Sequence, residues 1–413
     1  MTMKLRNRLI ALVCLLIFLT LGAGLFFGTG RNKPFAVILF VTDNLDPSVL
    51  TAVRIFSGGG DSRLQMEDFP NLALCRNAAN DFAVPDGASS STAIASGVRT
   101  NRRSLGTSPD GSKLSNLLEE AALRGRSTGL VSVGPITSPT AAAFYARTAD
   151  SADRKDILSQ FVNHQPYDLT ACLWDDNQDS PASTLKPLTD KGAVIARSIG
   201  ELDSRPFWKK DPTLALLSPS SLSAGKSGEV TTGEGTLSDL VRIAIRNLQS
   251  NRRGYLLVVD DPLVGIRASN NDAEAMFGEL QSLDQAVATA RRYAGENALV
   301  VVTGRQSLGG LVMNGYPFLR DKGISVIAMN NEGAPSVCWS TGPGFAPDSS
   351  PQPKLAKGTS ERVGILSQPA AFIQPTASGT AGDVLCFGVG QGSEKIRGFL
   401  NLTDVHKVMS NAL

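Results

Sequence analysis

Short, unbroken apolar runs recur along the chain and are bounded by turn residues. Their positions are residues 35–42, 127–133, 213–218, 255–260, 298–303, 324–329 and 384–389. Runs of this length that are rich in β-branched residues are typical of strands buried on both faces, as in a parallel sheet covered by helices. We therefore predict a buried strand at each of these positions.

Helical patterns separate several of these runs. Apolar residues recur at helical spacing over 112–126, 236–251 and 277–295, and a glycine lies where the first of these helices is expected to end. Repeated alternation of strand and helix indicates an α/β layer fold. Residues 218–235 and 343–361 are rich in turn-forming residues and are predicted to be irregular loops.

The first residues carry the clearest physical signal. Three basic side chains precede a charge-free, largely apolar run over residues 9–30, and about 20 such residues span a bilayer as a helix. The basic residues place the N-terminus on the cytoplasmic side, although Arg31 and Lys33 reduce the asymmetry. We predict that residues 1–34 are a membrane anchor and that residues 35–413 form one domain outside the cytoplasm. A cleaved signal peptide is the second interpretation, and a buried core helix is the third.

Composition and charge exclude several classes of function. The 413 residues include 40 Lys and Arg against 38 Asp and Glu, and this balance excludes a strongly basic nucleic-acid binder and an acidic disordered chain. Only two histidines are present, His164 and His406, so sites built from several imidazoles are excluded. We interpret His164 as a loop residue and His406 as a surface residue of a terminal helix. Neither has a sequence neighbour that would mark it as a ligand or base.

The five cysteines follow no metal or redox spacing. Cys14 lies in the predicted anchor, and Cys75, Cys172, Cys338 and Cys386 form no CxxC pair, so a zinc ribbon or a thioredoxin-like site is not expected. An oxidising compartment would permit disulfides, whose pairing the sequence does not determine. We interpret these four residues as buried free thiols.

Acidic residues follow two of the predicted strands. The first strand ends at Asp43, and the strand at 255–260 ends at Asp260 and Asp261. Ligands of open α/β sheets bind at the carboxyl ends of the strands, where two carboxylates could hold a hard cation such as Mg²⁺. The alternative is that these aspartates only cap the turns that follow.

A second candidate is the segment 84–97. Asp86 can cap a helix whose first turns, from Gly87 to Ser91, contain only small residues. The free N–H groups at such a helix start favour anions, phosphate among them. The alternative is a small-residue helix needed for close packing. The chain contains no GxxxxGK[ST] loop, no G-x-S-x-G elbow and no HExxH motif.

In chain order, these pieces resemble the alkaline phosphatase family. The segment FAVILFVTDNLDPSVLTAVRIF resembles the family's opening strand and helix, and VPDGASSSTAIASGVRT resembles the nucleophile segment V-x-D-S-A-x-[AS]-x-T-A. The match continues collinearly to about residue 410, through segments similar to [DH]-A-[ST]-P, V-E-G, T-A-D-H, Y-x-x-G-P-G and E-T-H-x-G-E-D-V. The resemblance implies a three-layer α/β/α sandwich.

The family's chemistry uses two zinc ions and a magnesium ion around a serine nucleophile, with an arginine that grips the phosphate. Carried over to this chain, the first metal-binding aspartate is Asp43, and the nucleophile position holds Gly87 after Asp86. In the magnesium loop, Ser138 keeps the Ser/Thr place, whereas the Asp/His place falls on Ile136. Asp260 replaces the V-E-G glutamate. The phosphate-gripping arginine falls on or near Ser151, with Arg147 and Arg154 as its neighbours.

The zinc positions of the family are lost in this comparison. The downstream Asp and His fall on Gly265 and Ser269, the T-A-D-H pair on Gly304 and Arg305, and the last histidine on Gly379. Without His or Cys ligands zinc binds poorly, so we expect no zinc and at most a residual magnesium ion. Ser89, Ser90 and Ser91 could only replace the nucleophile from a helical turn away, without a metal or a base.

Our leading hypothesis is therefore a pseudophosphatase with a binding or scaffolding role. The competing hypothesis is a phosphomonoesterase with a remodelled site of Asp43, Ser138 and Asp260 around one Mg²⁺. A third hypothesis is an anion-binding module formed by the helix start at 86–91, with Asp86, Gly87 and Ser89, together with Arg305. The expected partners are the membrane and an unknown protein or anionic ligand, but no nucleic acid. A homodimer is common in the family, although no sequence feature marks an interface.

Overall fold

The computed structural model describes residues 12–18, 20, 33–164, 167–174, 182–206, 208–222, 235–314, 335–344 and 368–413. The chain divides into two units, Met1–Pro34 and Phe35–Leu413. In the first unit, residues 12–18 are helical. No helix among the described residues is long and apolar enough to cross a membrane. Most of the predicted anchor at 9–30 lies outside these residues, so the anchor stays a prediction.

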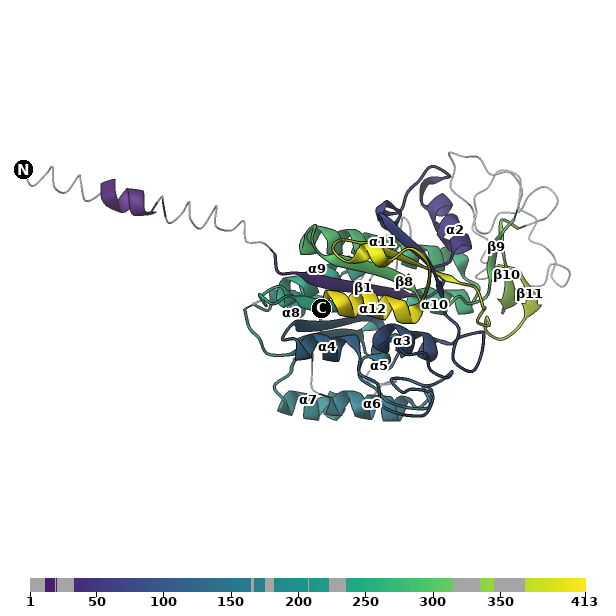
Figure 1. Cartoon of the computed structure of the whole chain (residues 1–413), viewed down its shortest axis with the longest axis horizontal. Helices are drawn as coiled ribbons and strands as arrows, with labels where there is room; N and C mark the ends of the chain where they lie inside the picture. Colours follow the sequence, from purple (N-terminus) through teal and green to yellow (C-terminus); the bar gives the residue numbers. More distant parts are fainter. Residues whose placement is uncertain are drawn as a thin grey trace, which may run out of the picture. The chain divides into compact units, whose positions relative to one another are not determined.

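A ten-stranded sheet forms the centre of the second unit (Figure 1). Its strand order is β13-β2-β12-β8-β1-β7-β3-β4-β6-β5. The strands are β1 (Ala36–Thr42), β2 (Asn71–Arg76), β3 (Ser127–Pro135), β4 (Leu169–Leu173), β5 (Val194–Ala196), β6 (Thr213–Leu217), β7 (Tyr255–Asp261), β8 (Leu299–Gly304), β12 (Val384–Val389) and β13 (Gly398–Asn401). The strands from β8 to β5 are mutually parallel, and β12 runs antiparallel to β8 and β2. A separate three-stranded sheet contains β9 (Leu311–Met313), β10 (Val337–Gly342) and β11 (Ala370–Ile373).

Helices cover both faces of the large sheet. One face packs against α2 (Pro47–Gly58), α8 (Ile199–Ser204), α9 (Leu237–Leu248), α10 (Leu263–Ser269) and α11 (Ala273–Ala294). The other packs against α3 (Gly87–Ser96), α4 (Leu117–Leu123), α5 (Pro139–Ala143), α6 (Arg154–Asn163), α7 (Lys186–Asp190) and α12 (Leu402–Ala412). Short 3₁₀ turns lie at Gln65–Asp68, Ala182–Leu185, Pro219–Ser221 and Ser393–Lys395. The three-layer α/β/α arrangement is the predicted one.

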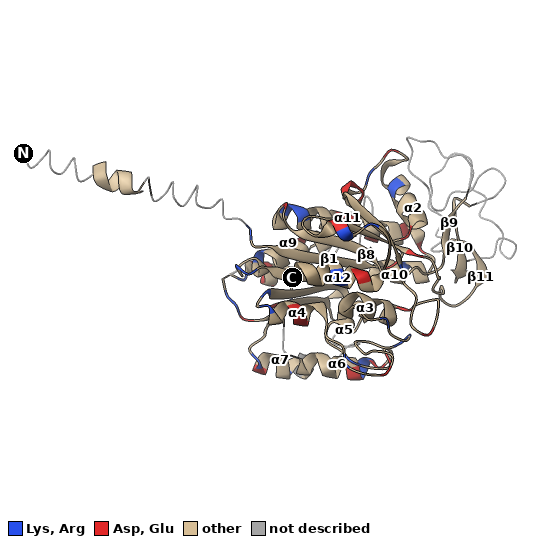
Figure 2. Cartoon of the chain, in the orientation of Figure 1, with Lys and Arg blue, Asp and Glu red and all other residues tan. Residues whose placement is uncertain are grey.

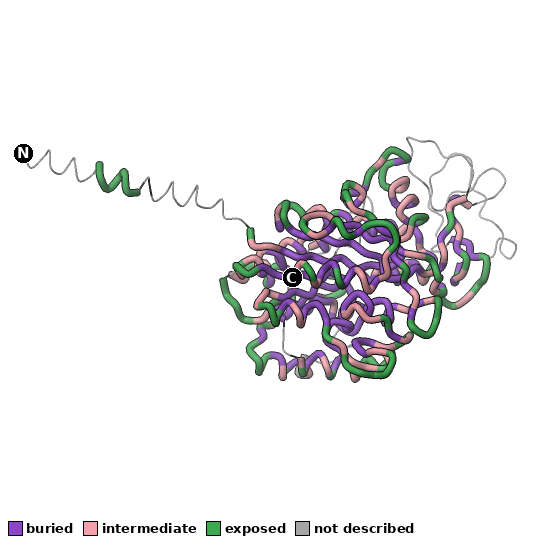
Figure 3. Tube along the Cα trace, viewed as in Figure 1, coloured by how far each residue is buried: buried purple, intermediate pink, exposed green. Residues whose placement is uncertain are grey.

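Two apolar cores explain this layering. Alternate residues of β1 point to opposite faces, so Ile38 and Phe40 belong to one core and Val37 and Leu39 to the other. All seven residues of β1 are buried, as the unbroken apolar run predicts. Figure 3 shows buried chain running through the centre of the domain, with exposed segments around it. Both cores are built from residues of the second unit, so residues 35–413 carry a complete core of their own.

Most of the predicted elements are present. Six of the seven predicted strands are confirmed as β1, β3, β6, β7, β8 and β12, whereas 324–329 lies outside the described residues. The predicted helices at 236–251 and 277–295 correspond to α9 and α11. The helix predicted at 112–126 is shorter, because Asn116 accepts hydrogen bonds from the N–H groups of Leu118 and Glu119 and caps α4. Most of the predicted loops at 218–235 and 343–361 also lie outside the described residues.

The interpretation of His406 as a surface residue without a partner was wrong. Its side chain is only 9% exposed, because it shares the buried stripe of α12 with Leu402, Val405 and Met409. The ring atom Nε2 lies 3.2 Å from Glu120 Oε1 on α4. The cysteines are free thiols, as interpreted; Cys75, Cys172 and Cys386 are buried, and Cys338 is half-buried.

The burial of His406 predicts a pH dependence of stability. Burial lowers the pKa of His406, and the nearby Glu120 carboxylate only partly offsets this effect. The unfolded chain therefore binds a proton at higher pH than the folded chain does. The free energy of unfolding keeps its full value above about pH 6.5, where the histidine is neutral in both states. Below that pH it decreases by at most about 1.4 kcal/mol per pH unit for one proton. In urea titrations of residues 35–413 from pH 7.5 to 5.5, we expect His406→Gln to lose less stability than the wild-type domain. His164→Gln tests whether the other histidine contributes, and coincident wild-type and His406→Gln profiles would contradict the prediction.

Candidate active site

Three polar segments meet at the carboxyl edge of the sheet. Asp43 follows β1, Asp260 and Asp261 end β7, and Arg305 follows β8. Because β1 lies between β7 and β8, its last residue, Thr42, pairs with Asp261 on one side and with Gly304 on the other. The strand order thus brings together residues more than 200 positions apart, at the edge where α/β sheets bind ligands.

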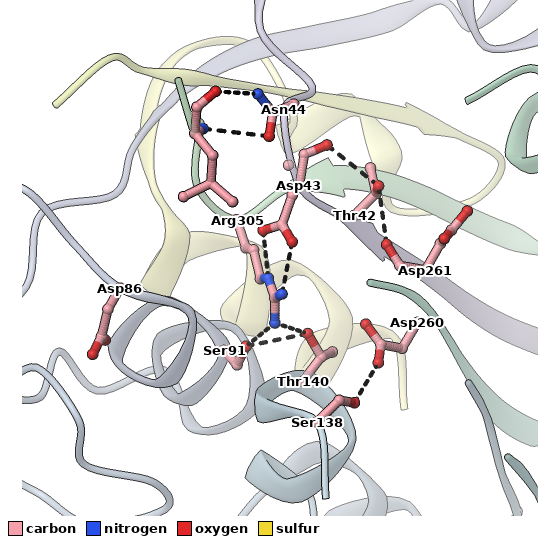
Figure 4. Close-up of polar contacts among 12 residues, drawn as sticks. Thr42, Asp43, Asn44, Asp86, Ser91, Ser138, Thr140, Asp260, Asp261 and Arg305 are labelled. Carbon is pink, nitrogen blue, oxygen red and sulfur yellow. Dashed lines mark hydrogen bonds and ion pairs between the residues drawn. The ribbon is translucent and has the colours of Figure 1, made fainter. Parts of the chain in front are cut away.

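The centre of the site is an ion pair between Arg305 and Asp43 (Figure 4). Arg305 Nε donates to Asp43 Oδ1 at 2.6 Å, and Nη2 donates to Oδ2 at 2.7 Å. The residues are 4% and 1% exposed. Burial alone would lower the pKa of Arg305, but the charge and hydrogen bonds of Asp43 outweigh it and raise this pKa. The pair is therefore a bidentate, desolvated contact between two full charges.

The far side of the Arg305 guanidinium contacts hydroxyl groups. Nη1 donates to Thr140 Oγ1 at 2.6 Å and to Ser91 Oγ at 3.3 Å, and these two oxygens are 3.2 Å apart. Thr140 lies on α5 and Ser91 on α3, so one cation joins both helices to β1. Together with the Asp43 contacts, four of the five N–H donors of Arg305 are used.

Asp260 lies beside this pair and is bound by different side chains. Its Oδ2 atom accepts hydrogen bonds from Ser132 Oγ at 2.8 Å and Ser138 Oγ at 2.9 Å. Burial raises the pKa of Asp260, although the positive charge of Arg305 and the serine hydroxyls act against this rise. Burial also raises the pKa of neighbouring Asp261 well above its usual range, reinforced by the Glu279 carboxylate.

Gly87 is the first residue of α3 and faces this cluster. A Cβ atom built on Gly87 would lie 3.4 Å from Gln306 Nε2 and 3.5 Å from Arg305 Cζ. Asp86 caps the helix: its Oδ1 accepts the Ser89 N–H at 2.9 Å, and its Oδ2 accepts the Arg103 N–H at 2.7 Å. Ser89 Oγ also donates to Asp86 Oδ1, at 2.8 Å.

The candidate residues are thus only partly assembled as expected. For the predicted metal site, Ser138 and Asp260 are in contact, but Asp43 is directed to Arg305. For the predicted anion site, Asp86, Gly87 and Ser89 share one helix start, where capping contacts use the Ser89 N–H and hydroxyl. Arg305 approaches this helix start with its guanidinium already bound to Asp43. Both sites stay predictions.

Sequence reasoning missed Ser132 and Thr140, and it considered Ser91 only as a replacement nucleophile and as part of the helix start, not as a partner of Arg305. It also missed Gln306, whose buried side chain is 8% exposed and lies next to Gly87. A signal for Gln306 was available. Counted from Thr303, the letters T-A-D-H extend to Gln306, so the aspartate and histidine places fall on Arg305 and Gln306 rather than on Gly304 and Arg305.

The residues present do not fit a zinc ion. Both carboxylate oxygens of Asp43 are taken by Arg305, and a side chain at Gly265 would have its Cβ atom 2.1 Å from Asp43 Oδ2. Ser269 Oγ donates to the Ile266 carbonyl. Within the described ranges, no group of three or more His, Cys, Asp or Glu residues could hold a metal ion. Arg147, a neighbour of the expected phosphate-gripping position, donates instead to Glu119 Oε1 at 2.6 Å.

Most of the domain matches one family model. The model is that of alkaline phosphatase, and it matches residues 35–169 and 203–413. The chain belongs to the alkaline phosphatase family. Alkaline phosphatase 4 of Bacillus subtilis (strain 168) is 22% identical over 411 residues, covering 91% of this chain and 88% of the relative. The tissue-nonspecific isozyme of Felis catus is 24% identical over 393 residues, covering 80% and 73%.

Solved structures of alkaline phosphatases share the fold. The enzyme from the Antarctic bacterium TAB5 superposes with a TM-score of 0.68 at 19% identity, covering 92% of this chain and 98% of that chain. A cold-active alkaline phosphatase from Shewanella sp. gives a TM-score of 0.71 at 18% identity, covering 91% and 99%. The large central sheet between helical layers is therefore the alkaline phosphatase fold.

Proposed function

We propose that this member of the alkaline phosphatase family is a pseudophosphatase with a binding or scaffolding role. The observation that carries the proposal is the position of Arg305. Its guanidinium takes both oxygens of Asp43, next to a glycine at the position where the family has its nucleophile. The positively charged guanidinium of Arg305 thus lies where the family's chemistry would use metal ions.

The hydroxyl groups near Gly87 support this proposal. A serine nucleophile needs an adjacent base, a lowered pKa or a metal ion to become reactive. Ser89 Oγ donates to Asp86 and Ser91 Oγ lies against Thr140 and Arg305. Ser90 Oγ is buried without a hydrogen-bond partner among the described residues. Ser91 thus has a guanidinium rather than a base beside it, and the Asp86 carboxylate that accepts the Ser89 hydroxyl is used as the helix cap.

The second candidate is a phosphomonoesterase with a remodelled magnesium-type site. It is favoured by the carboxylate of Asp260, which lies with the oxygens of Ser132 and Ser138. Oxygen donors of this kind suit Mg²⁺, although a single free carboxylate holds it weakly. The curated relatives are named as alkaline phosphatases, and one structural neighbour is a TAB5 alkaline phosphatase mutant with Mg bound in its M3 site.

A hydrolysis assay separates the two candidates. Residues 35–413 are incubated with p-nitrophenyl phosphate and with Mg²⁺, Mn²⁺ or Zn²⁺ in turn, and Asp43→Ala and Asp260→Ala serve as controls. We expect the wild-type domain to give no more turnover than either variant, because Gly87 offers no nucleophile and Arg305 occupies both carboxylate oxygens of Asp43. Turnover that is lost in Asp43→Ala or Asp260→Ala would refute the pseudophosphatase proposal. Metal analysis of the same sample would then identify the ion.

We also propose that the protein is held outside the cytoplasm by residues 1–34 and that it binds a protein or an anionic ligand there. The charge-free run at 9–30, after three basic residues, supports the anchor. The mass of the N-terminal peptide of the mature protein separates a retained anchor from a cleaved signal peptide. A homodimer stays a prediction.

A further inference from the structure

A groove of about 850 Å³ lies at the opposite edge of the sheet from the candidate active site. Its lining includes residues at the amino ends of β3 and β6 and at the end of α4, among them Thr128, Thr213 and Leu123. Three basic residues, Arg126, Lys209 and Lys210, also line it. None of these residues contributes to the Arg305 cluster.

The basic residues at this edge are exposed and available to a partner. Lys209, Lys210, Arg252 and Arg253 are exposed, and none of them forms an ion pair within the described part of the chain. Arg253 packs against the groove, since a Cβ atom on Gly125 would lie 2.5 Å from its Nη1. The Nη1 atom of Arg126 is buried without a hydrogen-bond partner among the described residues. Figure 2 shows blue segments at this end of the domain, around the start of β1 and at one end of α11.

The acidic residues that line the groove are occupied within the protein. Glu119 forms an ion pair with Arg147, and Asp168 accepts hydrogen bonds from the N–H and hydroxyl groups of Thr128. Asp211 lies 3.9 Å from Arg205. Asp168 keeps its negative charge, whereas Glu119 and Asp211 are ion-paired, so the positive charges of Lys209 and Lys210 outnumber the one unpaired acidic residue of the lining.

Two large apolar side chains accompany these charges. Leu123 lines the groove and is 86% exposed, and Trp208 directly precedes Lys209 and is 67% exposed. An exposed tryptophan beside lysines is typical of proteins that rest on a membrane surface, where the indole lies at the headgroup level. A soluble polyanion would explain the basic residues but not the exposed Leu123 and Trp208.

The folded domain begins at the same edge. Phe35, its first residue, precedes β1, and the guanidinium of Arg126 lies 5.5 Å from the centre of the Phe35 ring. The apolar run at 9–30 ends only a few residues before Phe35 in the sequence. The first unit is therefore attached to the domain at the edge of the sheet that holds the groove.

We propose that the amino edge of the sheet docks on a membrane and that the groove binds anionic phospholipid headgroups. Lys209, Lys210 and Arg253 would contact lipid phosphates, while Trp208 and Leu123 enter the headgroup region. Each basic residue near an anionic surface adds about fivefold to binding, equivalent to about 1 kcal/mol. Docking on one face would leave the edge with Arg305 and Gly87 turned toward the aqueous side.

The fluorescence of Trp208 tests this proposal in the full chain. The protein is placed in nanodiscs of phosphatidylcholine alone or mixed with phosphatidylglycerol, with brominated lipids as quenchers. The other two tryptophans, Trp174 and Trp339, are 4% and 1% exposed, so Trp208 reports the contact and Trp208→Phe gives the background. We expect quenching that is strong with phosphatidylglycerol, weak with phosphatidylcholine alone and reversed by 0.5 M NaCl, because the Debye length shortens from about 10 Å at 0.1 M salt to a few ångströms.

Charge-reversal variants test whether Lys209 and Lys210 contact the lipid. Lys209→Glu/Lys210→Glu is expected to lower the ratio of docked to undocked protein at least tenfold, because two contributions of about fivefold are lost. Arg102→Glu/Lys155→Glu, at two exposed residues that do not line the groove, is the matched control and keeps the wild-type quenching. Equal quenching in both lipids, or quenching unchanged by the Lys209 and Lys210 substitutions, would overturn the proposal. If the variant does not fold, the wild-type protein still tests the proposal, because quenching that 0.5 M NaCl does not reverse would contradict it.

Discussion

Replacing Arg305 with methionine is expected to lower the free energy of unfolding by about 3–5 kcal/mol, the range for removing one partner of a buried ion pair. The substitution leaves Asp43 buried, 1% exposed, without the two hydrogen bonds that it accepts from the guanidinium. It also removes the donor shared by Thr140 and Ser91. Urea titration of residues 35–413 at pH 7.5 measures the effect.

Two controls separate the buried pair from a general effect of losing an arginine. Arg103→Met breaks an ion pair with Asp150 that also uses both carboxylate oxygens but is largely exposed, so we expect a loss below about 1 kcal/mol. Adding Asp43→Asn to Arg305→Met removes the uncompensated charge, and the double variant should be more stable than the sum of the single losses predicts. A loss below 1 kcal/mol for Arg305→Met would contradict a structural role for the pair.

The same argument predicts the response to chelators. Because Arg305 neutralises Asp43 from within the chain, the melting temperature of residues 35–413 should not change with EDTA or with added Zn²⁺. In Arg305→Ala, the freed carboxylates of Asp43 and Asp260 can bind a cation, so added Mg²⁺ or Zn²⁺ should raise the melting temperature. Metal-dependent melting of the wild-type domain would contradict this account.

The sequence predicted six strands of the large sheet because their burial leaves an unbroken apolar run, but it did not predict β2 or β4, which also lie inside the sheet. It did not predict β5, which has three residues, or β13, where Phe399 is 65% exposed. Such short edge strands exist because a neighbouring strand supplies hydrogen-bond partners, as β2 does for β13. A local pattern contains no information about that neighbour.

The candidate active site, like the sheet, could be predicted only in part from the sequence. That Asp43 and Asp260 end buried strands follows from the apolar runs before them, and the sheet does bring both to one edge. The partner of Asp43 did not follow, because Arg305 lies 262 residues away and the two were expected to bind different ligands. Only the order of β8 and β1 in the sheet places these opposite charges in contact, and sequence spacing does not contain this order.

Replacing Gly265 with alanine is expected to destabilise residues 35–413 by about 1–3 kcal/mol, the usual range for overpacking a core. In an ordinary helix the same change is favourable by about 0.5–1 kcal/mol. Gly265 lies on α10, however, where an added Cβ atom would be 2.1 Å from Asp43 Oδ2 and 2.7 Å from Asp43 Cγ. Asp43 has little freedom to move away, because Arg305 holds both of its oxygens.

A matched substitution isolates this clash. Gly200→Ala on α8 places its Cβ atom no closer than 3.9 Å to another side chain, so we expect no loss of stability in urea titration. Asp43→Ala removes the atoms that collide, and Gly265→Ala should therefore add little further loss in that background. If Gly265→Ala were as stable as Gly200→Ala, Asp43 would have to leave its place beside Arg305 easily. The carboxylate would then be available to a metal ion, and the magnesium-site alternative would gain over the pseudophosphatase proposal.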